Sequence, residues 1–279
     1  MALVINAESV AGEFFGVHAR RQRLLTEERV RGSRVLLDRL TLEPGASAQL
    51  EVPAGNLAWF QMLEGTAALT HAGGEERLTR AHIVILPPAF RCTLASRTGA
   101  VLLYAEVPDA ARYDPKFSRN PPRLRAVDWT REPVLASQHD ARKRIYVVTP
   151  KLFGTRVIKG EMIIYPPGTE DSNHHHEGAE HFMYVTRGRG TAWANEKPFA
   201  VKKGDLILYA DRERHYLKSE GAEDMVFVEF FVPGEYTTIW APGTAVCTWL
   251  PTGRDIRGRR PAREIAAHSS ALVESPSDV

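Results

Sequence analysis

The chain has 279 residues, with 36 lysines and arginines, 34 aspartates and glutamates, and a formal net charge of +2. A charge balance this close to neutrality is not typical of a nucleic-acid-binding surface, so we expect no nucleic-acid partner. Hydrophobic residues make up 43% of the chain, which is ample for two buried cores.

Cysteine content and hydropathy bear on the compartment. The two cysteines, Cys92 and Cys247, are too few for a disulfide scaffold, which favours a reducing cytoplasm. The first residues lack the basic and apolar regions of a signal peptide. No apolar run reaches the roughly 18 residues that a membrane span needs. We therefore expect a cytoplasmic protein without a membrane partner.

The order of segments along the chain predicts two β domains. Residues 1–32 are polar and rich in arginine and are expected to form an N-terminal arm. Residues 33–106 contain short apolar runs (SRVLLDRLTL, AWFQML, HIVIL) cut by glycine and proline, a pattern that predicts strands. Residues 107–145 are rich in proline and arginine and are expected to be a linker. Residues 146–250 repeat the strand pattern, and residues 251–279 form a polar tail.

Many short strands with frequent turns indicate an all-β chain of two antiparallel barrels, with short helices in the linker and at the termini. One pattern occurs twice at a constant offset of 123 residues, which indicates a duplicated fold unit. The first copy reads Gly45, Glu51, Pro53, Ala58, Gly65, Ala81, Pro87, Ala89, Cys92 and Ser96, and the second reads Gly168, His174, His176, His181, Gly188, Gly204, Ala210, Arg212, His215 and Ser219.

Four histidines of the second copy indicate a metal site. His174 and His176 are two residues apart, so on a strand their side chains point to the same face. His181 follows after a short glycine-containing bend, and His215 comes from a separate strand pair. Imidazoles that converge from two strand pairs are typical of a transition-metal centre.

The first copy has Glu51, Pro53, Ala58 and Cys92 in the four corresponding positions. Proline and alanine offer no side-chain ligand, so we expect the first barrel to be metal-free and to serve in packing.

The spacing Gly-x5-His-x-His-x4-His-x6-Gly, followed by the second glycine and histidine motif, resembles the cupin superfamily. The resemblance covers about 33–106 and 150–235, so the chain looks like a bicupin, which implies two small jelly-roll barrels. The usual third ligand of that family is a glutamate, and His181 stands in its place. Ala210, Arg212 and Ser219 stand where the family has proline, glycine and asparagine.

Glu180 offers a second register for the third ligand. Adjacent residues of a strand face opposite ways, so Glu180 and His181 cannot both point inward in regular geometry. The first copy aligns Ala58 with His181 and keeps six residues before the glycine. This alignment favours His181 and leaves Glu180 as the alternative ligand.

Four imidazole ligands leave two positions open on an octahedral metal. The resemblance implies one divalent transition metal per chain, with Fe or Mn favoured and Zn or Ni as alternatives. We expect a dioxygenase-type oxidoreductase that acts on a small organic acid or enolisable carbonyl compound with O2. The habits of the family also imply a homodimer, although a bicupin can also satisfy the pairing of barrels within one chain.

Two other classes of function remain open. The plan of a silent first barrel and a metal in the second is similar to (S)-ureidoglycine aminohydrolase, which implies a non-oxidative isomerase or hydrolase. His175, Glu177 and His215 depart from the ligand pattern of that family. The third class is a non-catalytic protein that binds a small molecule.

Further side chains on or beside the second set of strands are candidates for substrate binding, and about half of them should point inward. These candidates are Arg156, Tyr165, Tyr184, Trp193, Tyr209 and Glu229.

Overall fold

The structure, a computed structural model, describes residues 2–268. These residues confirm the expected all-β class. They divide into two compact units, one of Ala7–Trp129 with Phe153–Val157 and the other of residues 2–6, 130–152 and 158–268. The described helices are short: α1 (Pro150–Phe153), η1 (Ala7–Ser9), η2 (Ala110–Arg112) and η3 (Trp129–Arg131). Among the described residues, no helix has the length and apolar character needed to cross a membrane.

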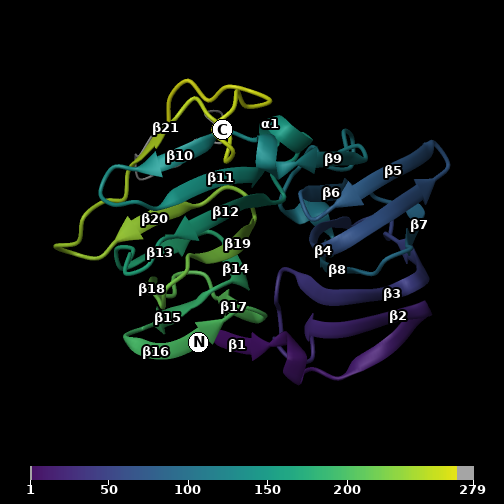
Figure 1. The fold of residues 1–279 in the computed structure, drawn as a ribbon, viewed down its shortest axis with the longest axis horizontal. Coiled ribbons are helices and arrows are strands. Elements are labelled where there is room, and N and C mark those ends of the chain that lie inside the picture. Colours follow the sequence, from purple (N-terminus) through teal and green to yellow (C-terminus); the bar gives the residue numbers. More distant parts are fainter. Residues whose placement is uncertain (1, 269–279) are drawn as a thin grey trace. The chain divides into compact units, whose positions relative to one another are not determined.

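The unit that contains Ala7–Trp129 is an antiparallel barrel (Figure 1). Its strand order is β2-β3-β7-β4-β6-β9, with β5 paired to β4 and β8 paired to both β3 and β4. Its interior is apolar, with residues such as Phe60, Leu69 and Leu102 almost fully buried. Its strands are β2 (Gly12–Leu25), β3 (Leu36–Glu51), β4 (Leu57–His71), β5 (Gly74–Thr79), β6 (His82–Leu86), β7 (Arg91–Ser96), β8 (Ala100–Val107) and β9 (Arg125–Asp128).

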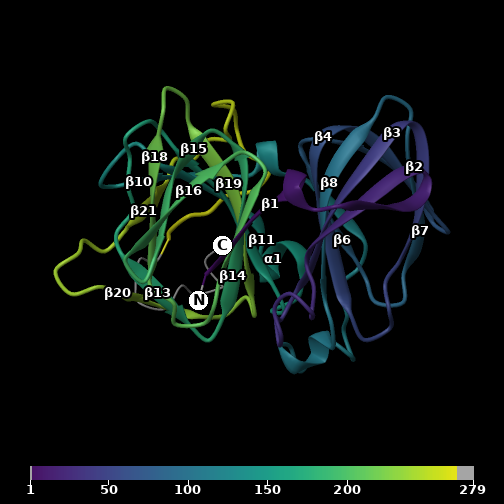
Figure 2. The same ribbon diagram turned by 90° about the horizontal axis from the view of Figure 1, so that it is seen from below.

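The other unit has two antiparallel sheets, whose strands wrap into a barrel (Figure 2). One sheet has the order β1-β17-β14-β19-β12-β11-β10-β21, and the other has the order β16-β15-β18-β13-β20. Its strands are β1 (Leu3–Asn6), β10 (Val134–Ser137), β11 (Lys143–Val148), β12 (Lys159–Tyr165), β13 (His174–Glu177), β14 (Glu180–Arg187), β15 (Arg189–Ala194), β16 (Lys197–Lys202), β17 (Asp205–Tyr209), β18 (His215–Glu220), β19 (Met225–Val232), β20 (Thr237–Trp240) and β21 (Trp249–Pro251).

Residues 1–32, expected as an arm, supply strands. Leu3–Asn6 pair with β17, where Leu3 lies opposite Leu208. Gly12–Leu25 form β2, which pairs with β3. The segment therefore takes part in the sheets of both units.

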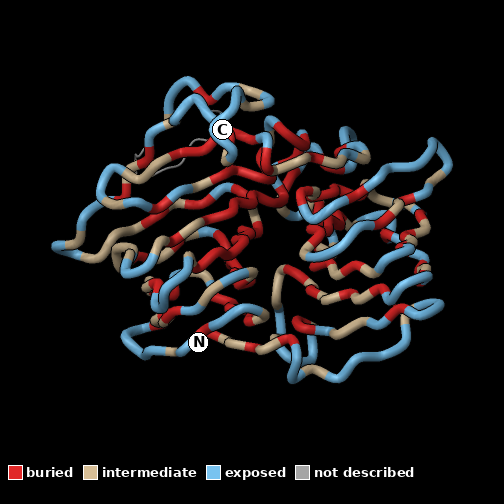
Figure 3. Tube along the Cα trace, in the orientation of Figure 1, coloured by how far each residue is buried: buried red, intermediate tan, exposed pale blue. Residues whose placement is uncertain are grey.

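Buried residues alternate with more exposed ones along many of the strands (Figure 3). In the second barrel, Met183 and Val185 of β14 pack with Ile207 and Phe227 in one apolar core. His181 precedes Met183 by two residues, so the alternation of the strand places His181 on this inner face. The apolar core thus extends into the histidine site.

The sequence repeat is visible in the backbone. Gly65 and Gly188 both have a positive φ, 72° and 75°. Ala89 and Arg212 also correspond in the repeat, and their φ values are 56° and 65°. A positive φ is uncommon for residues other than glycine, so the shared conformation shows that both units make the same turns.

Candidate metal centre

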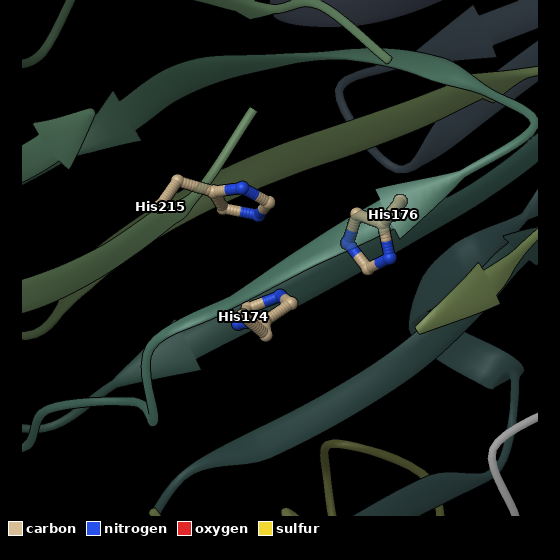
Figure 4. Close-up of side chains that lie close together, drawn as sticks. All are labelled: His174, His176 and His215. Carbon is tan, nitrogen blue, oxygen red and sulfur yellow. The ribbon is translucent and has the colours of Figure 1, made fainter. Parts of the chain in front are cut away.

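His174 and His176 lie on β13, and His215 begins β18. Residues 174 and 215 are direct cross-strand partners, which brings their side chains to the same face of the sheet. Figure 4 shows the three imidazoles pointing toward a common space between the strands. His181, the first inward residue of β14, reaches the same space from the opposite sheet.

The four imidazole rings form one cluster. The ring centroids of His174 and His215 are 4.3 Å apart, and those of His181 and His215 are 4.5 Å apart. The centroid of His176 lies 4.9 Å from that of His174 and 4.8 Å from that of His181. All four side chains are buried, with exposed fractions from 0% to 8%. The structure therefore brings together the four histidines expected as metal ligands.

Three of the imidazoles are oriented through Nδ1. His174 Nδ1 lies 2.7 Å from the carbonyl oxygen of Ser172, and His215 Nδ1 lies 2.8 Å from that of Glu213. A carbonyl oxygen only accepts, so in both residues Nδ1 carries the hydrogen and Nε2 keeps a free lone pair. His176 Nδ1 lies 3.1 Å from Thr238 Oγ1. Partners of this kind fix the orientation of metal-bound histidines.

The remaining nitrogens fit a metal. Within residues 2–268, His215 Nε2 and both ring nitrogens of His181 are buried without a hydrogen-bond partner. A buried polar atom without a partner is costly, and a bound cation would satisfy it. The ring of His181 is held between Tyr209 and Phe231, at centroid distances of 5.1 and 5.0 Å.

The electrostatics also favour the form of histidine that binds metal. Burial lowers the pKa of His174 to about 4 and that of His215 to about 3. Burial also lowers the pKa values of His176 and His181 well below their usual range. The four imidazoles are therefore neutral at pH 7, and neutral imidazole is the ligand form.

The donor atoms fall into two overlapping trios. One consists of His174, His176 and His215, and the other of His176, His181 and Glu229; within each trio the donor atoms lie within 4.8 Å of one another. His176 belongs to both. Among the described residues, Glu180 enters neither trio. It precedes His181 on β14, and adjacent strand residues face opposite ways.

The corresponding residues of the first barrel are not arranged in this way. The Glu51 side chain is 62% exposed, and its Oε1 lies 2.7 Å from Arg91 Nη2. Ala58 and Cys92 lie in the apolar core, and burial raises the pKa of the Cys92 thiol to about 11. Both trios found among residues 2–268 belong to the second barrel.

The candidate substrate residues separate into those near the histidines and those away from them. Tyr209 stacks on His215, and Glu229 Oε1 lies 3.4 Å from His181 Nε2. Tyr165 is buried on the inner face farther along β12, where Arg142 Nη1 donates to its hydroxyl at 3.2 Å.

The other three candidates for substrate binding do not lie beside the histidine cluster. Tyr184 alternates with Met183 and Val185 and so lies on the other face of β14. Trp193 stacks on Tyr216, with centroids 4.6 Å apart. Arg156 is exposed in the loop after α1 and belongs to the other unit.

Buried charged residues on β11 and β12 were not among the expected site residues. Lys159 and Glu161 have exposed fractions of 2% and 1%. Lys159 Nζ donates to the Tyr236 hydroxyl at 3.1 Å, and the Tyr236 ring lies 4.8 Å from that of His176. Arg144 Nε lies 3.2 Å from Glu161 Oε2. In the sequence KGEMIIY of β12, strand alternation places Lys159 and Glu161 on one face. This alternation could have indicated from sequence that both charged side chains point inward.

Comparisons with known proteins agree with this description. Residues 161–231 match the family described as Cupin domain. No curated protein matches the chain in sequence. The second barrel is a cupin domain, and the chain has the fold of the two-barrel cupins, as the sequence resemblance implied.

Three solved structures illustrate the similarity. The E. coli protein Ylba has a TM-score of 0.65 and 14% identity, over 83% of this chain and 90% of that one. An oxalate decarboxylase from Lactobacillus farciminis, solved as a formate complex, has a TM-score of 0.68 and 15% identity, over 85% of this chain and 88% of that one. The Bacillus subtilis oxalate decarboxylase, studied for its Mn(II) centres, has a TM-score of 0.65 and 16% identity, over 85% of this chain and 78% of that one. At these identities the likeness shows the fold.

Proposed function

We propose that this protein is a metal-dependent enzyme that acts on a small organic acid or enolisable carbonyl compound, with dioxygenase-type chemistry. One observation carries the proposal. Four buried imidazoles converge inside one barrel, and His181 and His215 keep nitrogen atoms there without a hydrogen-bond partner in the described chain. A bound cation would satisfy these buried nitrogens.

His174, His176, His181 and His215 would hold one divalent ion, Fe or Mn by preference, with Zn or Ni as alternatives. The ion would supply Lewis acidity toward a carbonyl or carboxylate oxygen and a route to oxygen chemistry. Because the four ligands are neutral, the divalent ion would keep its full positive charge. That charge favours an anionic substrate. The buried ammonium of Lys159, beside Tyr236, adds positive charge to the same interior.

The aromatic residues of the site would exclude water. Tyr209, Phe231 and Tyr236 surround the histidines, with exposed fractions of 0%, 1% and 8%. Removing water strengthens the attraction between a bound cation and an anionic ligand because the local dielectric constant falls.

A second candidate function is non-oxidative chemistry on a similar acid, such as decarboxylation, isomerisation or hydrolysis. The similarity in fold to oxalate decarboxylases, one of them described with Mn(II) centres, supports this candidate. A Lewis-acid metal serves such reactions without consuming O2.

The test is elemental analysis of untagged protein purified without added metal, followed by O2-electrode and CO2 measurements over oxalate, diketones, hydroxy acids and phenolic acids. Near-stoichiometric Fe or Mn with O2 consumption supports the first candidate. CO2 release or isomerised product without net O2 consumption supports the second. Absence of bound metal would refute both.

A pair of variants tests the site itself. His176→Ala should lose metal and activity together, whereas Cys92→Ala, in the core of the other barrel, should keep both. A second pair tests the register: His181→Gln should weaken metal binding more than Glu180→Gln. The reverse order would show that Glu180 is the ligand.

A further inference from the structure

We propose that Glu229 is a fifth ligand of the metal, so that the centre has four imidazoles and one carboxylate. This inference rests on the metal centre of the proposed function and deepens it. It changes the charge of the ligand set from neutral to −1 and leaves one open position on an octahedral ion instead of two.

The position of Glu229 follows from the strand register. Phe231 of β19 lies opposite His181, and Glu229 lies opposite Met183. Cross-strand partners share a face, and residues two apart on a strand do as well, so Glu229 points to the same interior as His181. Its exposed fraction is 4%.

The distances suit a shared ion. Glu229 Oε1 lies 3.4 Å from His181 Nε2. One donor atom from each of Glu229, His181 and His176 lies within 4.8 Å of the other two. Two donors that are each about 2.1 Å from one ion, at right angles, are about 3 Å apart. His176 also belongs to the trio with His174 and His215, so it links Glu229 and His181 to the other two histidines.

The neighbouring Glu161 shows that the arrangement is specific to Glu229. The two acids are direct partners across β12 and β19. Glu161, however, lies 3.2 Å from Arg144 Nε and enters no group of potential ligands within residues 2–268. Glu229, by contrast, belongs to a trio of potential ligands together with His176 and His181.

A carboxylate in the ligand set has a consequence for metal choice. Carboxylate oxygen suits Mn(II) better than the softer ions, whereas imidazole binds the whole late first-row series. Loss of the Glu229 carboxylate should therefore weaken Mn(II) binding more than Zn(II) binding.

The experiment measures metal affinity and spectra without reference to turnover. Metal-stripped wild type, Glu229→Gln and Glu161→Gln are titrated with Mn(II) and Zn(II) against a competing chelator, and the Mn(II) EPR spectra are recorded. Glu229→Gln should bind Mn(II) at least about 10-fold more weakly, with an altered spectrum; even outer-sphere partners of a metal are worth about 10–100-fold. Glu161→Gln should change the affinity by less than the Glu229 variant and keep the wild-type spectrum.

The outcomes separate the two proposals. If wild type binds no metal, both the proposed function and this inference are wrong. If wild type binds Mn(II) and Glu229→Gln binds it equally well with the same spectrum, only this inference is wrong. Should Glu229→Gln fail to fold by circular dichroism, Glu229→Asp replaces it, because shortening the side chain withdraws the oxygen while keeping the charge.

Discussion

The ring of Tyr209 lies against the ring of His215, with centroids 4.4 Å apart and planes at 27°. The same tyrosine packs on His181 at 5.1 Å, and its hydroxyl donates to the carbonyl oxygen of Trp193 at 3.4 Å. One side chain of β17 thus supports two candidate ligands from two different sheets. Tyr209 has no imidazole to bind the metal, so we expect it to position the rings of His181 and His215.

Tyr209→Phe should keep near-wild-type metal affinity because the ring remains in place. Tyr209→Ala should lower the free energy of unfolding by about 3–5 kcal/mol, the usual cost of removing a large buried aromatic side chain, and should weaken metal binding. Urea unfolding of the metal-stripped variants and chelator competition measure the two effects. Equal metal affinity in the alanine variant would show that the stacking does not position the imidazoles.

Thr238 is the hydrogen-bond partner of His176. Thr238→Val removes the hydroxyl that lies 3.1 Å from His176 Nδ1 while keeping the shape of the side chain. We expect metal affinity to fall about 10–100-fold, as is usual when an outer partner of a ligating histidine is lost. Thr237→Val is the matched control, since residue 237 faces the opposite way on β20. If both variants bind metal alike, the hydroxyl does not orient the imidazole.

Much of the site was predictable from sequence because it depends on local periodicity. Strand alternation alone places His174 with His176 and separates His181 from Glu180. The repeat indicates which unit carries the histidines. These inferences depend only on residues close together in sequence and on the constant spacing of the repeat.

Contacts between strands distant in sequence were not predictable. Glu229 meets His181 only because β19 pairs with β14, and Lys159 meets Tyr236 across 77 residues of chain. The pairing of Leu3–Asn6 with β17 spans about 200 residues, as the opposition of Leu3 and Leu208 shows. Register of this kind is set by the packing of the whole barrel, which a sequence pattern does not contain.

Two glycines of the second repeat unit differ in what surrounds them. Gly168 and Gly188 have φ values of 79° and 75°, but a Cβ on Gly188 would lie 2.5 Å from the Asp224 carbonyl oxygen, whereas no described atom lies within 4 Å of one on Gly168. Gly168→Ala should therefore cost only the conformational strain, about 1–2 kcal/mol.

Gly188→Ala should cost more than Gly168→Ala because the backbone at Asp224 and Met225, where β19 begins, must also move away. Thermal or urea unfolding of both variants gives the difference, with the metal removed so that binding does not contribute. Equal destabilisation would mean that the β14–β15 turn relaxes without strain at the Asp224 carbonyl.

The first barrel permits a pH test that does not involve the metal. Asp38 has a side chain only 16% exposed, and Arg21 Nε lies 4.0 Å from its carboxylate. Burial outweighs the attraction of Arg21 and raises the pKa of Asp38 to about 6. In the unfolded chain the pKa of aspartate is about 3.9. Between these values the folded state holds more protons than the unfolded state.

The stabilising effect of the protonated Asp38 is therefore present at low pH and is lost as the pH rises from about 4 to about 6, at up to about 1.4 kcal/mol per pH unit. Asp38→Asn removes this titration, so its stability relative to wild type should increase over that window by about 2–3 kcal/mol. Urea unfolding of both proteins at pH 4, 5, 6 and 7 measures the difference. Parallel stability curves would mean that water or Arg21 compensates the buried charge fully.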